Sequence, residues 1–224
     1  MVVAMTVTQF PADFSLRAHT VLAFPTPIVA FQWPDSAALN TDLRDTILAA
    51  EKDRTGIVAS NVGGWHSDTD LFDWPDACIG DLRARVLATA TELVTIASGR
   101  EDAVHSAQFG FEAWANVVRS GDFHSVHKHA NYMWSGVYYV TIGNPDPDRV
   151  TSGHIEFIDP RDAAGMVSLP ELRFSQRQVI PPQAGLMLIF PAWLKHYVHP
   201  YYGDGERISI SFNIIVLDLQ VADI

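Results

Sequence analysis

The stretch RISISFNIIV, residues Arg207–Val216, decides the fold class because polar and apolar residues alternate along it. Successive side chains of a β-strand point to opposite faces. One face therefore carries Arg207, Ser209, Ser211 and Asn213, and the other carries Ile208, Ile210, Phe212 and Ile214. The apolar row predicts burial against a core or against helices, and the polar row is then directed at a cavity.

Short runs rich in Val, Ile, Tyr and Phe precede this strand from about residue 109 onward. Turn signals such as SGD, GNPDPD, PPQAG and YGDGE separate them. The pattern predicts an antiparallel barrel or a two-sheet jelly roll. The further predicted strands are Ala113–Arg119, Phe123–His129, Trp134–Ile142, His154–Ile158, Arg177–Ile180, Leu186–Phe190 and His196–His199.

The first half of the chain has a mixed pattern. Val21–Trp33 alternates loosely and contains two prolines, which suits an edge strand. Apolar residues at helical spacing predict one helix from Asp35 or Ser36 to about Lys52 and a second from about Pro75 to Ala97. We expect an α+β, predominantly β chain whose N-terminal helices pack on one sheet. It forms a single domain over residues 1–224, with a mixed support region at 1–108 and a β core at 109–216.

Composition restricts the class of function. The chain has 224 residues and a formal net charge of −11, which argues against non-specific binding to nucleic acid or to an anionic membrane. Cys78 is the only cysteine, so the sequence has neither an intrachain disulfide nor a zinc site made of thiolates. No signal peptide and no membrane-length apolar run is present, so we expect a cytoplasmic protein. The sequence does not determine the oligomeric state, although an exposed edge strand is compatible with a homodimer.

The spacing of the histidines predicts a metal site. His127 and His129 stand two apart in a predicted strand, so both imidazoles point to the same face. His196 comes on a later strand. A ligand pair on one strand and a third ligand on another builds a facial site with open positions. His124 and His199 flank these residues and are expected to support the site or to contact solvent, and His66 either lines the cavity mouth or packs in a loop.

Arg207 and Ser209 predict a carboxylate receptor close to the metal. A guanidinium fork and a hydroxyl on one face of a strand can together hold a carboxylate. The two sites suit a dicarboxylate that chelates the metal at one end and is anchored at the other. The alternative is a surface ion pair between Arg207 and Glu206 or Asp204.

Four segments resemble the family of 2-oxoglutarate/Fe(II)-dependent oxygenases. They are HKHANYMWSGVYYV from His127, GHIEFIDPR from Gly153, PPQAGLMLIFPAWLKHYVHPYYGDGERISISFN from Pro181 and NVGGWHS from Asn61. The combination is specific, and the resemblance covers roughly residues 21–216. This chain has Ala130 where the family often has proline.

The resemblance implies a double-stranded β-helix and assigns the residues of the site. The metal ligands would be His127, His129 and His196. The metal would be iron(II), and the co-substrates would be 2-oxoglutarate and molecular oxygen. Arg207 and Ser209 would hold the distal carboxylate of 2-oxoglutarate. Asn116 and Tyr138 are further candidates for binding the co-substrate, with Tyr139 as the alternative to Tyr138.

His129 departs from the wider superfamily, in which this position carries a carboxylate. The resemblance makes His129 the ligand, and Asp122 or Glu156 is the alternative. We expect an enzyme that hydroxylates a small molecule or a side chain and releases succinate and carbon dioxide. The rivals are a cupin-like three-histidine dioxygenase or isomerase that does not use 2-oxoglutarate, and a non-catalytic module that binds a metal or ligand.

Overall fold

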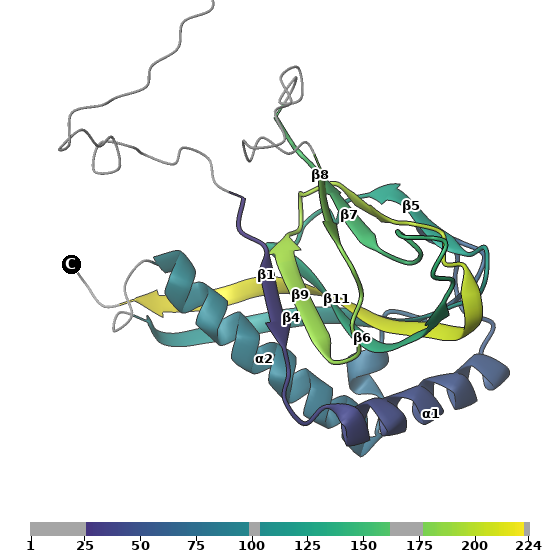
Figure 1. Cartoon of the computed structure of the whole chain (residues 1–224). Helices are drawn as coiled ribbons and strands as arrows, with labels where there is room; N and C mark the ends of the chain where they lie inside the picture. The colour runs from purple at the N-terminus through teal and green to yellow at the C-terminus, as the bar shows by residue number, and fades with distance from the viewer. Residues whose placement is uncertain (1–25, 99–103, 162–176, 222–224) are drawn as a thin grey trace, which may run out of the picture.

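Two antiparallel sheets form the framework of the computed structural model, which describes residues 26–98, 104–161 and 177–221 (Figure 1). The six-stranded sheet has the order β1 (Val29–Gln32), β9 (Leu186–Pro191), β6 (Trp134–Pro145), β11 (Gly203–Val221), β4 (Val104–Val118) and β3 (Trp65–His66). The five-stranded sheet has the order β2 (Asn61–Val62), β5 (Phe123–His127), β10 (His196–Val198), β7 (Ile155–Ile158) and β8 (Arg177–Ile180). The predicted mostly β, two-sheet architecture is confirmed.

Two helices cover the outer face of the six-stranded sheet (Figure 1). These are α1 (Ala37–Asp53) and α2 (Ala77–Ser98), and the segment between them contains β2, β3 and a short 3₁₀ turn, η2 (Leu71–Asp73). Their apolar sides pack against the apolar row of β11, as the alternation of that strand predicted. The contact is made by Leu43, Ile47, Leu82, Val86, Ile208, Ile210, Phe212 and Ile214, which are all fully buried.

A second, smaller core fills part of the space between the two sheets. It contains Tyr139, Leu188 and Phe190 from the six-stranded sheet, and Ile155 and Phe157 from the five-stranded sheet. Strands whose side chains are buried on both faces form the middle of the six-stranded sheet, with β6 as the clearest case. The site described below lies beside this second core.

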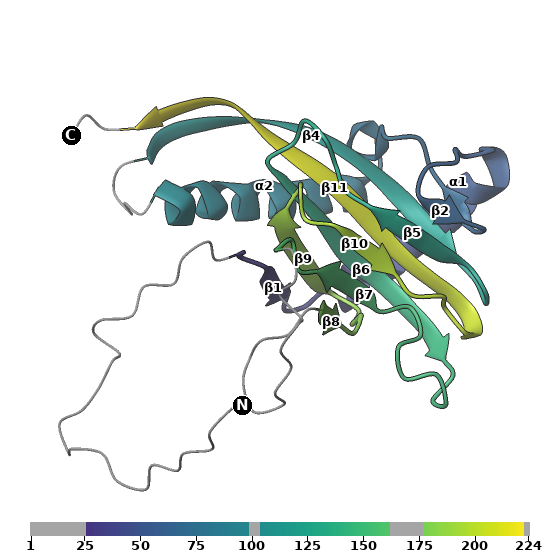
Figure 2. The ribbon, with the colours of Figure 1, turned by 90° about the horizontal axis from the view of Figure 1, so that it is seen from above.

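The central pair β4 and β11 is longer than predicted. Its register runs from Arg207 opposite Val118 to Val221 opposite Val104. The two strands extend past their neighbours as a two-stranded ribbon, and α2 follows this ribbon in both views (Figures 1 and 2). The prediction ended β11 at Val216 although alternation resumes after it, with Leu217 and Leu219 exposed on the ribbon.

The N-terminal half supplies strands to both sheets. β1 pairs with β9, β2 with β5 and β3 with β4. β1 is shorter than the predicted strand Val21–Trp33, whose first five residues lie outside the described part of the chain. The helix boundaries agree with prediction within two residues at each end.

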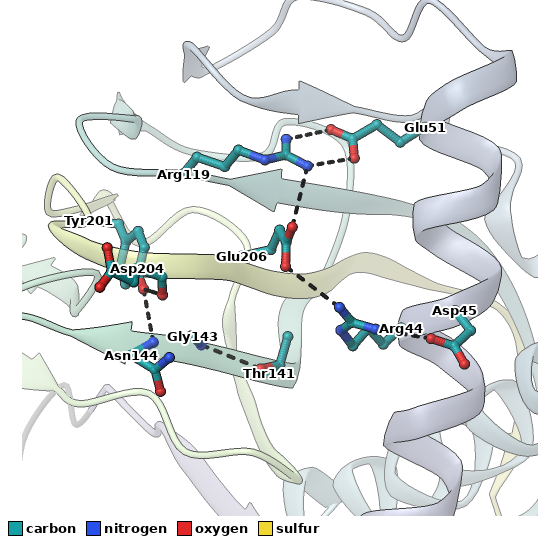
Figure 3. Close-up of polar contacts among 10 residues, drawn as sticks. All are labelled: Arg44, Asp45, Glu51, Arg119, Thr141, Gly143, Asn144, Tyr201, Asp204 and Glu206. Atoms are coloured by element: carbon teal, nitrogen blue, oxygen red, sulfur yellow. Dashed lines mark hydrogen bonds and ion pairs between the residues drawn. The ribbon is translucent and has the colours of Figure 1, made fainter.

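An ionic network on the surface joins α1 to the ends of β4 and β11 (Figure 3). The Arg119 guanidinium contacts the two carboxylate oxygens of Glu51 at 2.6 and 2.9 Å. Glu206 lies between Arg119 and Arg44, at 3.8 and 3.7 Å.

No helix among the described residues is long and apolar enough to cross a membrane.

Candidate metal centre and co-substrate pocket

Three histidines converge between the sheets. One ring nitrogen from each of His127, His129 and His196 lies within 4.8 Å of the others. His127 ends β5, His196 begins β10, and the two residues face each other in the register of these strands. The antiparallel pairing therefore places two of the three imidazoles side by side.

His129 reaches the group from outside the strand. The predicted strand Phe123–His129 ends at His127, so the two-residue alternation does not place the second imidazole. Instead, the backbone N–H of His129 donates to the carbonyl of Ala192 at 2.9 Å. This bond ties the segment after β5 to the turn between β9 and β10, the same turn that leads into His196.

Hydrogen bonds at Nδ1 leave the Nε2 atoms of two histidines as candidate ligand atoms, and Nε2 of His127 also lies 3.5 Å from Oγ of Ser60. Nδ1 of His127 lies 2.7 Å from the carbonyl of Ser125, and Nδ1 of His196 lies 2.9 Å from the carbonyl of Leu194. An imidazole that donates Nδ1–H to a carbonyl keeps the Nε2 lone pair for a metal.

Burial favours the neutral, ligating form of these imidazoles. It lowers the pKa of His196 to about 3 and that of His129 to about 4, with a smaller contribution from the neighbouring His127. Burial also lowers the pKa of His127. Neutral imidazoles bind zinc, copper, iron and nickel, and three of them on one side leave positions open. The donor set therefore fits a catalytic transition metal.

Neither carboxylate named as an alternative to His129 joins the group. Asp122 accepts a hydrogen bond from the backbone N–H of Arg119 at 2.8 Å. Glu156 contacts His199 at 2.8 Å and Arg177 at 3.4 Å. Within the described ranges, the three histidines are the only group of potential ligands that is close enough to hold a metal.

Arg207 lies fully buried beside the histidines. It is 1% exposed and lines the same pocket as Ser209, Ser211 and the three histidines. Its Nε donates to the carbonyl of Gly153 at 3.1 Å, and its Nη1 lies 3.4 Å from Oγ of Ser209. Burial lowers the pKa of Arg207, although a guanidinium stays protonated in proteins.

The charge of Arg207 has no carboxylate partner among the residues that the structure describes. The alternative of an ion pair with Glu206 or Asp204 is therefore wrong, because Glu206 contacts Arg44 and Arg119 on the surface. A buried cation without an anion is destabilising. The pocket therefore fits a ligand that brings a carboxylate.

Two further polar groups in this pocket lack hydrogen-bond partners. Oδ1 of Asn116 and the hydroxyl of Tyr139 are buried and unsatisfied, while Nδ2 of Asn116 donates to Oγ of Ser211 at 3.1 Å. The guanidinium of Arg207 lies over the Tyr139 ring, 5.1 Å from its centroid. Buried polar groups without partners indicate a bound ligand or water.

Tyr138 is not at the site, which corrects the prediction for this residue. Its hydroxyl donates to Oδ1 of Asn40 on α1 at 2.6 Å, within the helix-facing core. Neighbouring residues of a strand point to opposite faces, so Tyr139 is the tyrosine that enters the pocket. The structure brings together Asn116, Arg207, Ser209 and the three histidines as predicted.

His124 and His66 occupy different places around the histidine group. His124 is buried in the pocket of Arg207, where its Nδ1 lies 3.3 Å from Oγ of Ser60, and burial lowers its pKa to about 3. His66 stacks on Trp114 at a ring distance of 5.5 Å and lines a second cavity of ≈ 280 Å³. Both cavities include Trp114, His127 and His129, so the metal group lies where they meet.

Comparison with known proteins assigns the β-rich half of the chain. Residues 112–213, which contain all three histidines, Asn116 and Arg207, match the family described as "Putative 2OG-Fe(II) oxygenase". This match agrees with the resemblance stated from the sequence. No curated protein sequence matches the chain.

Solved structures of 2-oxoglutarate oxygenases share the fold. A Pseudomonas putida prolyl-4-hydroxylase is 15% identical, with 88% of this chain and 93% of that chain covered and a TM-score of 0.57. A prolyl hydroxylase from Trichoplax adhaerens, in complex with a hypoxia inducible factor peptide fragment, is 12% identical, with 84% and 82% covered and a TM-score of 0.56. HygX from Streptomyces hygroscopicus, with nickel and 2-oxoglutarate bound, is 11% identical, with 84% and 82% covered and a TM-score of 0.55. The two sheets therefore form the double-stranded β-helix of these enzymes.

Proposed function

We propose that the protein is an iron(II)- and 2-oxoglutarate-dependent oxygenase that hydroxylates a small molecule or a side chain. In this reaction 2-oxoglutarate and oxygen are converted to succinate and carbon dioxide while a C–H bond of the substrate becomes C–OH. The observation that carries the proposal is the buried guanidinium of Arg207, which has no carboxylate partner within the described residues and lies in one pocket with three convergent histidines.

Each group in the pocket has a role in this proposal. His127, His129 and His196 would hold iron(II), which supplies the oxidation chemistry when it is bound. Arg207 and Ser209 anchor the distal carboxylate of 2-oxoglutarate, so that its 2-oxo acid end is directed toward the histidines. The Tyr139 hydroxyl, which lies close to Arg207 in the pocket, donates to the same carboxylate.

The two cavities separate co-substrate from substrate. The pocket of Arg207 lies between the sheets and is lined by buried residues such as Phe190 and Ile155. The second cavity meets it at His127, His129 and Trp114. A substrate held there would have its C–H bond beside the histidines that would hold the metal.

The test measures succinate formation by the purified protein supplied with iron(II), 2-oxoglutarate and oxygen. We expect succinate only when both iron and 2-oxoglutarate are present, and metal binding lost in His127→Ala and His196→Ala. An Arg207→Met variant is expected to keep the metal and lose affinity for 2-oxoglutarate. Unchanged iron content in His127→Ala would show that the site assignment is wrong.

A cupin-like three-histidine dioxygenase is the second candidate, because no carboxylate lies among the ligands that the described residues provide. Such an enzyme would consume oxygen in the presence of iron and its own substrate without 2-oxoglutarate. The two candidates therefore differ in whether oxygen uptake depends on 2-oxoglutarate. The unpaired charge of Arg207 favours oxygen uptake that depends on 2-oxoglutarate.

A further inference from the structure

The second cavity, of ≈ 280 Å³, contains a carboxylate that belongs to neither the metal group nor the co-substrate pocket. One part of its wall is the stacked pair His66 and Trp114, and another part is Glu112 on β4 with Asn213 on β11. Ligand cavities range from roughly 300 to 1,000 Å³. This cavity lies just below that range and fits a small molecule or a single side chain.

Hydrogen bonds hold the Glu112 carboxylate in place. Glu112 and Asn213 face each other in the register of β4 and β11, and Nδ2 of Asn213 donates to Oε2 of Glu112 at 3.2 Å. The buried hydroxyl of Ser135 donates to Oδ1 of Asn213 at 2.7 Å. This second bond fixes the orientation of the amide, so that its N–H₂ group is directed at Glu112.

The Glu112 carboxylate makes no ion pair with any Lys, Arg or His of the described ranges. Lys128 lines the same cavity, but its side chain is exposed, so its charge is solvated and screened. A carboxylate has about four acceptor positions, of which Asn213 uses one and the Tyr132 hydroxyl another. Acceptor capacity with a full negative charge therefore remains open toward the cavity.

The charge of Glu112 acts close to the metal group. The negative charge raises the pKa of His129 and so offsets part of the lowering that burial causes. Glu112 is nevertheless absent from the group of residues whose ligand atoms converge. The carboxylate is thus near the reacting centre without being one of its ligands.

We propose that the second cavity binds a small substrate with a protonated amine, which Glu112 holds as its counter-ion. A carboxylate in a partly buried cavity is stabilised by a cation far more than by a neutral donor. The carbon skeleton of the amine lies against Trp114 and His66. An acidic substrate is disfavoured there because two like charges would meet in a confined space. The inference rests on the proposed function only in naming this ligand as the molecule that is oxidised.

Three matched probes of similar size test the proposal: benzylammonium, benzyl alcohol and benzoate. Binding is measured by calorimetry and by ligand-detected NMR, both with the metal-free protein and with the zinc-loaded protein in the presence of 2-oxoglutarate. We expect benzylammonium to bind at least about tenfold more tightly than benzyl alcohol, which corresponds to one charge-assisted hydrogen bond. Benzoate is expected to bind more weakly than either.

The Glu112→Gln variant keeps an acceptor for Asn213 and removes the charge. We expect it to abolish the preference for benzylammonium while leaving the affinity for benzyl alcohol and for zinc unchanged. Glu92→Gln, at an exposed position on α2, is the matched control and should keep the preference. Equal binding of benzylammonium and benzyl alcohol to the wild-type protein would overturn the proposal. So would a loss of zinc affinity in Glu112→Gln with an unchanged amine preference, since Glu112 would then support the metal centre.

The outcomes also separate this inference from the proposed function. A protein that prefers benzylammonium through Glu112 but never forms succinate would leave the amine site standing and remove the oxygenase reaction. A protein that forms succinate without any amine preference would support the oxygenase reaction and rule out the amine site.

Discussion

Arg207 combines two properties that oppose each other in the ligand-free protein: full burial and a positive charge without a carboxylate partner in the described chain. Such a charge lowers the stability of the fold, and an entering anion reverses the effect. The residue is therefore best understood as part of a binding site that is completed by its ligand.

Replacement of Arg207 by methionine removes the charge and keeps most of the side-chain volume. We expect the Kd for 2-oxoglutarate to rise about 10- to 100-fold, the range expected for loss of a hydrogen bond to a charged group. We also expect the free energy of unfolding without ligand to rise by about 1 kcal/mol. Calorimetry and urea unfolding measure the two quantities. Arg119→Met, on the surface, is the control and should leave the Kd for 2-oxoglutarate unchanged. If Arg207→Met had the same Kd as the wild type, Arg207 would not be the residue that anchors 2-oxoglutarate.

Gly153 provides the carbonyl that accepts from Arg207 and also the space for its side chain. A Cβ at this position would lie 2.9 Å from Cδ and 3.0 Å from Nε of Arg207. We expect Gly153→Ala to displace the guanidinium and to weaken 2-oxoglutarate binding about tenfold. The measurement is the Kd for 2-oxoglutarate in the zinc-loaded protein.

Gly121→Ala is the matched control for this substitution. Both glycines have positive φ, +66° for Gly153 and +96° for Gly121, so both alanine variants strain the backbone. No atom lies within 4 Å of a Cβ added at Gly121. If the two variants weaken binding equally, backbone strain and not contact with Arg207 is the cause.

The site could be predicted from sequence wherever polar and apolar residues alternate. Arg207 and Ser209 were placed correctly because every second residue of their strand is apolar. Tyr138 and Tyr139 could not be distinguished, because the side chains of β6 are buried on both faces and the two neighbours are identical in type. Glu112 was missed, since its partner Asn213 is far along the chain and only the strand register brings them together.

At the scale of elements, α1 is held by apolar burial more than by its surface charges. Leu43 and Ile47 are 0% exposed in the helix–sheet core, whereas the side chain of Arg119, which pairs with Glu51, is 48% exposed (Figure 3). Exposed ion pairs contribute about 0–1 kcal/mol, because water and salt screen them.

Truncation of a buried side chain of α1 should therefore lower the free energy of unfolding more than loss of its ion pair. We expect Ile47→Ala to lower the free energy of unfolding by about 2–5 kcal/mol, and Glu51→Gln by less than about 1 kcal/mol. Urea unfolding followed by circular dichroism measures both. A larger loss in Glu51→Gln than in Ile47→Ala would mean that the charge network fixes the helix.

Element boundaries were predicted well where a turn signal or a change of period marks them. The two helices and most strands from Phe123 onward agree closely. The exception is β11, which begins four residues earlier and ends five residues later than predicted, and no strand is predicted at β2 or β3. These two strands have only two residues each, too few to show an alternation. They pair with β5 and β4 and thereby place Ser60 and His66 beside the histidines.

For the whole molecule, the buried histidines make stability depend on pH. Burial lowers the pKa of His124 and of His196 to about 3, against about 6.5 in an unfolded chain. Between these values the unfolded chain binds protons that the folded chain does not. The stability contributed by the neutral imidazoles is therefore present above pH 6.5 and is lost as the pH falls toward 3.

We expect the metal-free protein to lose about 2 kcal/mol of unfolding free energy for each of these histidines between pH 7.5 and pH 5. His124→Asn should remove about 2 kcal/mol of the total loss, because this position then no longer titrates. Urea unfolding at the two pH values gives the comparison. Identical pH dependence in wild type and His124→Asn would contradict the burial of a neutral imidazole at this position.

The place of β11 in the sheet has a consequence for how the protein is made in a cell. β11 is the last described strand along the chain, yet it lies between β4 and β6. While the ribosome is still synthesising it, β4 and β6 each present an unpaired edge, and such edges promote aggregation. Contacts between residues so distant in sequence also form slowly. The yield of folded protein should therefore depend on growth temperature and on chaperones that bind the nascent chain until Arg207 and its strand close the gap.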